Sequence, residues 1–197
     1  PIIGGIVTQT ATSPRGSSTL NLGATTNSVK KGFIMSGHAA GCSANIGTEV
    51  GQNFLSIRKV GNVLTNPPNN RFSDSAFVEF KKDAGGNYLY TADQSKIYRG
   101  ANLSYNILGK TTSTQTPVGT TVKIMGWSTN HIESGSINLK GVNVSNTLCG
   151  GTLTNQVRAT YASLDGDSGA PIFSSPDGSY NVYYYGIHVG RLTVSGT

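Results

Sequence analysis

The chain has 197 residues and a formal net charge of +6, with 36% hydrophobic and only 12% charged residues. This length is enough for one large domain or two small lobes with a buried core, and the clustered apolar residues exclude a disordered chain. No apolar run approaches the ~18 residues of a membrane span. Basic residues that adjoin one another occur only as isolated pairs such as Lys30-Lys31 and Lys81-Lys82. We therefore expect neither a membrane nor a nucleic-acid partner.

The predicted elements are short apolar runs separated by clusters of Gly, Asn, Pro and Ser. In chain order they cover residues 2–7, 32–35, 54–57, 75–80, 105–108, 120–125, 136–139, 156–161, 171–173 and 181–189. Many short strands with regular turns, and no long helical period, predict an all-β sandwich or barrel. The polar, Thr-rich segment 110–119 predicts a linker that divides the chain into residues 1–110 and 111–197.

The cysteine content leaves two states open. Cys42 and Cys149 either form one disulfide or stay free and buried. The sequence has no CxxC or Cys/His cluster, so we expect no metal and no cofactor. The first residue is Pro rather than Met, and Asn102 and Asn143 each begin a glycosylation sequon. These features favour a processed, secreted protein that lies outside the cell.

Three residue types needed for nucleophilic catalysis lie at predicted strand edges. Ser168 lies in "GDSG", where flanking glycines permit a tight turn that aims the Gly166 and Ser168 N–H groups at one point, as an oxyanion hole needs. His38 follows an apolar strand on a turn of small residues, and Asp74 precedes an alternating strand. Each residue alone has an ordinary structural explanation. Together they provide a nucleophile, a base and an orienting carboxylate in the chain order His, Asp, Ser.

Four motifs resemble the chymotrypsin-like serine peptidases, and within them the alpha-lytic protease, streptogrisin and glutamyl endopeptidase group. "PIIGGI" at residues 1–6 is similar to the opening segment of that group. "KKGFIMSGHAAG" at 30–41 is similar to its histidine motif, "SDSAFVEF" at 73–80 to its aspartate motif, and "GDSGAPIF" at 166–173 to its serine motif. The resemblance extends over nearly the whole chain, to about residue 191.

The resemblance implies two six-stranded antiparallel β-barrels with the active site in the cleft between them. His38 is then the general base, Asp74 its orienting carboxylate and Ser168 the nucleophile, with the Gly166 and Ser168 amides as the oxyanion hole. Asp167 is a structural carboxylate that shapes the turn. Because a lone buried charge is costly, we expect an internal Lys or Arg beside it.

The resemblance also suggests the substrate preference. In glutamyl endopeptidases and viral 3C-like proteases, a histidine like His188 in "GIHVG" contacts a Glu or Gln side chain, and Ser163 stands where those relatives have Ser or Thr. Both groups donate hydrogen bonds that suit a carboxylate. Arg191 adds positive charge at the pocket mouth or narrows it, whereas Asp165 opposes an acidic substrate if it faces the cleft. The alternative is that His188 is an ordinary core residue.

Some positions depart from the family pattern. Val189 stands where a serine often supports the aspartate, and Ser36 is the candidate replacement. Residues 192–197 are expected to close the second barrel. The main hypothesis is a secreted, monomeric serine endopeptidase that acts on protein or peptide substrates. The alternatives are an inactive homologue used as a binding module or effector, and an adhesion or carbohydrate-binding β-domain.

Overall fold

The fold was analysed in a computed structural model that describes residues 2–10, 17–42, 46–52, 58–68, 70–145 and 148–191. Its strands are β1 (Ile2–Gly4), β2 (Val7–Thr10), β3 (Ser17–Thr19), β4 (Gly23–Thr25), β5 (Lys31–Ser36), β6 (Glu49–Gln52), β7 (Arg58–Thr65), β8 (Ser75–Phe80), β9 (Ala92–Tyr98), β10 (Ser104–Lys110), β11 (Thr121–Met125), β12 (Ile132–Ser145), β13 (Thr152–Ala159), β14 (Pro171–Phe173) and β15 (Asn181–Ile187). The only helix in these ranges is a 3₁₀ turn, Ser113–Gln115, and none of their helices is long and apolar enough to cross a membrane. The all-β prediction is confirmed.

The first sheet contains seven strands in the order β3-β2-β6-β7-β8-β5-β4, all paired antiparallel. Its strands bury one face because apolar residues recur along them, as at Phe33 and Met35 in β5 and at Val78 in β8. Each such side chain contributes about 1.5–3 kcal/mol when it is fully removed from water. This sheet carries His38 at the end of β5 and Asp74 at the start of β8.

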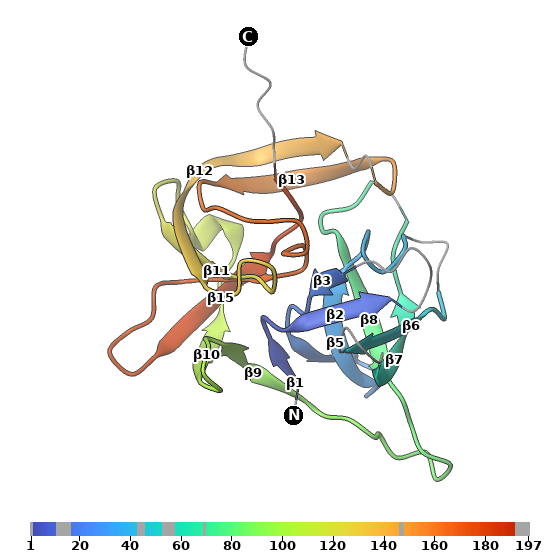
Figure 1. The fold of residues 1–197 in the computed structure, drawn as a ribbon. Helices are drawn as coiled ribbons and strands as arrows, with labels where there is room; N and C mark the ends of the chain where they lie inside the picture. Colours follow the sequence, from blue (N-terminus) through green and yellow to red (C-terminus); the bar gives the residue numbers. More distant parts are fainter. Residues whose placement is uncertain are drawn as a thin grey trace.

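The second sheet contains eight strands in the order β1-β9-β10-β15-β14-β11-β12-β13. Two of its pairings, β1 with β9 and β10 with β15, are parallel, and the others are antiparallel. Buried residues fill two clusters along it, represented by Ile97 and Phe173 in one and by Ile124 and Ile172 in the other. Figure 1 shows the two curled sheets side by side. The expected architecture is confirmed, with more strands per sheet than the predicted six.

The predicted strands agree with the structure where apolar residues are dense. The run 75–80 is β8 and 171–173 is β14, whereas 181–189 is too long, since β15 ends at Ile187. Residues 54–57 and 192–197 lie outside the described residues. The first sheet ends with β8, and β9 and β10 belong to the second sheet. The predicted boundary between residues 110 and 111 concerns folding units rather than sheets, and it stays a prediction.

The hairpin of β12 and β13 connects the two halves. It is the edge of the second sheet, and it extends over the loops of the first (Figure 1). The Arg71 N–H donates to the Thr152 carbonyl at 3.2 Å, and the Thr154 N–H donates to the Arg71 carbonyl at 3.0 Å. Near the hairpin tip, Cys149 forms a disulfide with Cys42. This contact fixes the loops that carry His38 and Asp74 against the second half.

Candidate active site

The pairing of β5 with β8 brings His38 and Asp74 together. The two strands are antiparallel, with Ser36 opposite Ser75, so the end of one lies beside the start of the other. The Gly37 N–H continues the ladder by donating to the Asp74 carbonyl at 3.0 Å. The His38 imidazole then lies with its Nδ1 2.5 Å from Asp74 Oδ2, an orienting contact of the kind a general base needs.

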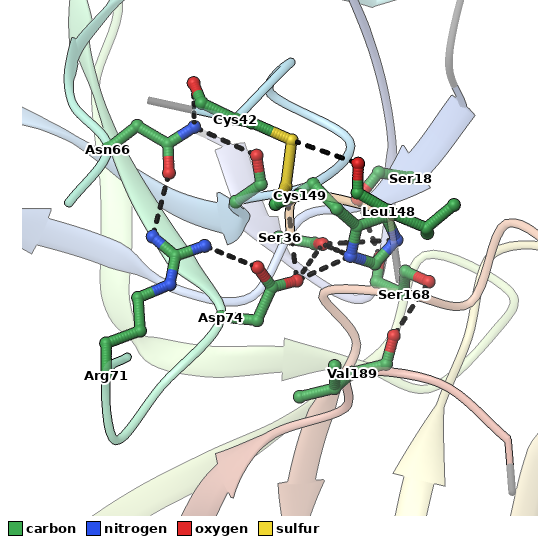
Figure 2. A network of polar contacts seen from close by, with 12 residues as sticks. Ser18, Ser36, Cys42, Asn66, Arg71, Asp74, Leu148, Cys149, Ser168 and Val189 are labelled. Carbon is green, nitrogen blue, oxygen red and sulfur yellow. Dashed lines mark hydrogen bonds and ion pairs between the residues drawn. A yellow bond between two sulfur atoms is a disulfide. The ribbon is translucent and has the colours of Figure 1, made fainter. Parts of the chain in front are cut away.

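Asp74 is fully buried and has several donors. The Ser36 hydroxyl donates to Oδ2 at 2.9 Å, as the sequence suggested, and the Arg71 guanidinium binds Oδ1 at 2.6 Å (Figure 2). Burial by itself would raise the pKa of this carboxyl, but the bonds from His38 and Ser36 and the Arg71 charge hold its pKa below the usual value. Asp74 is therefore ionised at neutral pH.

Ser168 comes from the turn before β14 and contacts the first half. Its carbonyl accepts hydrogen bonds from the Ser18 hydroxyl at 2.6 Å and the Thr19 N–H at 2.8 Å. Its own hydroxyl donates to the Val189 carbonyl at 3.1 Å (Figure 2). Among the described residues, no hydrogen bond joins this hydroxyl to the His38 ring.

The backbone around Ser168 leaves two amide donors available. Neither the Gly166 nor the Ser168 N–H donates a hydrogen bond to any residue in the described ranges. Unpaired amides next to a serine hydroxyl suit the negative oxygen of a tetrahedral intermediate.

The fully buried Asp167 is held by backbone amides, whereas the sequence predicted an internal Lys or Arg beside it. Its Oδ1 accepts from the Ser128 and Thr129 N–H groups at 2.8 and 3.2 Å, and its Oδ2 accepts from the Leu164 N–H at 2.8 Å. No Lys or Arg among the described residues forms an ion pair with it. Three converging N–H dipoles replace the missing cation. A Cβ on Gly126 would lie 2.1 Å from Asp167 Oδ1, so this cradle requires glycine.

The candidate specificity pocket lies in a cleft of about 910 Å³ that His38, Ser163, His188 and Arg191 line together. His188 is only 6% exposed and Ser163 is 7% exposed. The Tyr161 hydroxyl lies 3.0 Å from His188 Nδ1, and the two rings meet edge to face. The structure places Ser163, His188 and Arg191 in one cleft and adds Tyr161 beside His188, and their role as a specificity pocket stays a prediction.

Burial controls the ionisation of this pocket. It lowers the pKa of His188 to about 4, and the nearby His38 and Arg191 act in the same direction. Burial also raises the pKa of Tyr161 well above its usual value. At neutral pH both side chains are uncharged, so His188 has one N–H to donate.

Arg191 lies at the cleft, and its guanidinium is already paired. Its Nη2 lies 2.5 Å from Asp165 Oδ1, in a contact where the Asp165 side chain is 96% exposed. The positive charge expected at the pocket mouth is therefore offset by the acidic residue that the sequence marked as unfavourable. Because both groups are exposed, the pair contributes little to stability.

Solved structures resemble the whole chain. The structure of Thermobifida fusca protease A aligns with 98% of this chain and covers 84% of the protease, with a TM-score of 0.70 and 21% sequence identity. The structure of an alpha-lytic protease homologue aligns with 96% of this chain and covers 85% of the homologue, with a TM-score of 0.68 and 22% identity. A serine protease described as glutamic acid specific, with a histidine triad in substrate binding, matches 100% and 89% with 0.67 and 25%. The chain has the chymotrypsin-like serine protease fold. The resemblance predicted from the four motifs is confirmed, and the relatives support a serine endopeptidase. Protein-family models and curated proteins give no match to the sequence.

Within this protease fold, the sequence missed the residues that support Asp74 from behind. Arg71 binds Asp74, and the Asn66 side chain bonds Arg71 and the backbone of the His38 loop. Both residues lie around "NPPNNR", whose Pro and Asn content predicted only a turn. The spacing of Arg71 three residues before Asp74 was the one available signal.

Proposed function

We propose that the chain is a secreted serine endopeptidase in which His38, Asp74 and Ser168 form the catalytic triad. The observation that carries this proposal is the contact between His38 and the buried, ionised Asp74, with Ser168 docked on β3 of the same half. Serine-protease chemistry requires a base held by a carboxylate next to a hydroxyl, and the order of the three residues in the chain matches the resembled family.

Each chemical step has a candidate group. Ser168 Oγ attacks the scissile carbonyl carbon while its proton moves to His38 Nε2, and the Gly166 and Ser168 N–H groups receive the oxyanion. His38 then gives the proton to the leaving amine, and an acyl-enzyme remains. A water that His38 deprotonates hydrolyses the ester and regenerates Ser168. Before attack, the hydroxyl must leave the Val189 carbonyl, to which it donates in this structure.

The pocket supports a preference for Glu, with Gln as the alternative, before the scissile bond. In this proposal the protonated Tyr161 hydroxyl donates to His188 Nδ1, the tautomer that leaves the imidazole proton on Nε2 to be donated into the pocket. The Ser163 hydroxyl is the second donor, and Arg191 lies at the mouth, where Asp165 offsets its charge. Two neutral donors accept either a carboxylate or a carboxamide oxygen. A carboxylate gains more from them, because charge-assisted hydrogen bonds are stronger.

Secretion is part of the same proposal. The Cys42–Cys149 disulfide suits an oxidising compartment, and the relatives include proteases of the alpha-lytic type. We also propose that the protein is a monomer that acts on protein or peptide substrates. Residues 1–110 and 111–197 are its two proposed folding units.

The test is labelling with a fluorophosphonate probe followed by identification of the modified residue. We expect labelling at Ser168 that disappears in Ser168→Ala and falls strongly in His38→Ala, while Ser175→Ala, a control at an exposed loop position, labels normally. A folded wild type that resists the probe would favour the second candidate, a binding module that uses the same cleft. The observation that favours a binding module is the Ser168 hydroxyl, which donates to the Val189 carbonyl rather than to His38.

A further inference from the structure

Arg71 binds the carboxylate oxygen of Asp74 that faces away from His38. Asp74 Oδ2 faces His38 and Ser36, whereas Oδ1 lies 2.6 Å from Arg71 Nη2. The Arg71 side chain is only 9% exposed, so this ion pair is shielded from water. Arg71 therefore places a permanent positive charge against a fully buried carboxylate, which would otherwise be costly.

The surroundings of Arg71 fix its guanidinium at one position. Nη1 donates to Asn66 Oδ1 at 3.0 Å and to the Pro67 carbonyl at 2.6 Å. Asn66 in turn donates to the Gly37 carbonyl at 2.9 Å, next to His38. A Cβ on Gly37 would lie 2.3 Å from Arg71 Nη2 and 2.9 Å from Asp74 Oδ1, so the histidine turn leaves room for this ion pair.

The second half of the protein holds the same network. The backbone of Arg71 is bonded on both sides to β13, and Asn66 also donates to the Cys42 carbonyl at 2.7 Å. Cys42 is joined to Cys149 at the hairpin tip (Figure 2). Arg71 is therefore part of a continuous connection from the hairpin to the triad carboxylate.

We propose that Arg71, supported by Asn66, is a positioning residue that sets both the orientation and the effective charge of Asp74; this inference rests on the proposed protease function. Val189 supplies no hydroxyl to Asp74, so Ser36 and Arg71 provide this support from the first half. The positive charge of Arg71 also partly offsets the negative charge of the Asp74 carboxylate. That carboxylate is the group that stabilises an imidazolium on His38.

The test compares Arg71→Met and Arg71→Lys with wild type, and with Arg58→Met as the matched control. Arg58 is exposed and its guanidinium lies over the Tyr90 ring, on the first sheet. Fluorophosphonate titration gives the active fraction, so kcat is counted per functional site. We expect Arg71→Met to lower kcat about tenfold with KM within about twofold. The acid limb of its pH–rate profile should move up by about half a pH unit to one unit. In Arg71→Lys the acid limb should return most of the way to its wild-type position, because lysine keeps the positive charge. Lysine lacks the guanidinium's forked set of hydrogen-bond donors.

A purely structural role would lower the active fraction and leave the acid limb of the surviving enzyme in place. An acid limb of Arg71→Met that coincides with wild type therefore overturns the proposal. A second measurement does not depend on catalysis: the downfield proton resonance of His38 Nδ1 in the Ser168→Ala background. It should shift on Arg71→Met and stay on Arg58→Met, and no shift overturns the positioning role. If wild type does not label at Ser168, the protease proposal fails while this resonance still decides the role of Arg71.

Discussion

The buried histidine of the pocket predicts how stability depends on pH. Burial lowers the pKa of His188 to about 4 from an ordinary value of 6.5, so between these values the unfolded chain binds more protons than the folded one. Stability is therefore complete above about pH 6.5 and is lost as pH falls toward 4. The difference of about 2.5 pKa units corresponds to roughly 3 kcal/mol in the free energy of unfolding.

The assay is urea unfolding of Ser168→Ala, which prevents self-digestion, at several pH values between about 7.5 and 4.5. The additional substitution His188→Gln keeps a hydrogen-bonding partner for Tyr161 and removes the group that titrates. Most of the roughly 3 kcal/mol decrease in the free energy of unfolding at acid pH should therefore vanish. His131→Gln is the control, because Glu133 raises the pKa of the exposed His131 and its contribution has the opposite sign. Equal acid losses with and without His188 would refute the reasoning.

Three further predictions concern the disulfide, the Asp167 cradle and the pocket. Replacing Cys42 and Cys149, which are 107 residues apart, by serine should lower the free energy of unfolding by about 4–5 kcal/mol in denaturant titration, and a loss below ~1 kcal/mol would contradict this. Gly126→Ala should cost about 1–3 kcal/mol and lower kcat because the new methyl group displaces Asp167, whereas Gly178→Ala, with open space around it, should be neutral; equal melting temperatures would count against the cradle. The ratio of kcat/KM for Glu and Gln substrates should stay nearly constant as pH falls from about 8 to 6, because His188, with a pKa of about 4, donates as a neutral imidazole over this range. A ratio that rises steeply with falling pH would contradict the neutral pocket.

The sequence predicted the parts of the fold where side chains carry the signal. β8 carries apolar residues at four of its six positions, so its existence and bounds were visible. In β9 only Ile97 is fully buried, and the polar sequence around it concealed the strand. The strand is held in place by β10, which follows it in the chain, and by β1, which lies at the other end of this half of the sequence. Sheet membership therefore depends on pairings that no local period reveals.

The candidate site divides in the same way. His38, Asp74 and Ser168 lie in recognisable sequence motifs, so the sequence could predict these individual residues as candidates. The amides that hold Asp167 have no side-chain signature, because any residue supplies a backbone N–H. Arg71 was missed since a polar turn usually exposes its arginine, and here the Arg71 side chain is only 9% exposed. These supporting contacts arise only when loops that are separate in the sequence fold against one another within each half.

The most direct test of the account is digestion of a peptide library by wild type and by Ser168→Ala, with the cleavage sites identified by mass spectrometry. The account predicts cleavage after Glu, and to a smaller extent after Gln, by wild type alone, and it predicts loss of this preference in His188→Ala. Cleavage after other residues that His188→Ala leaves unchanged would contradict the pocket. No cleavage by folded wild type would contradict the central claim that this site is a serine protease.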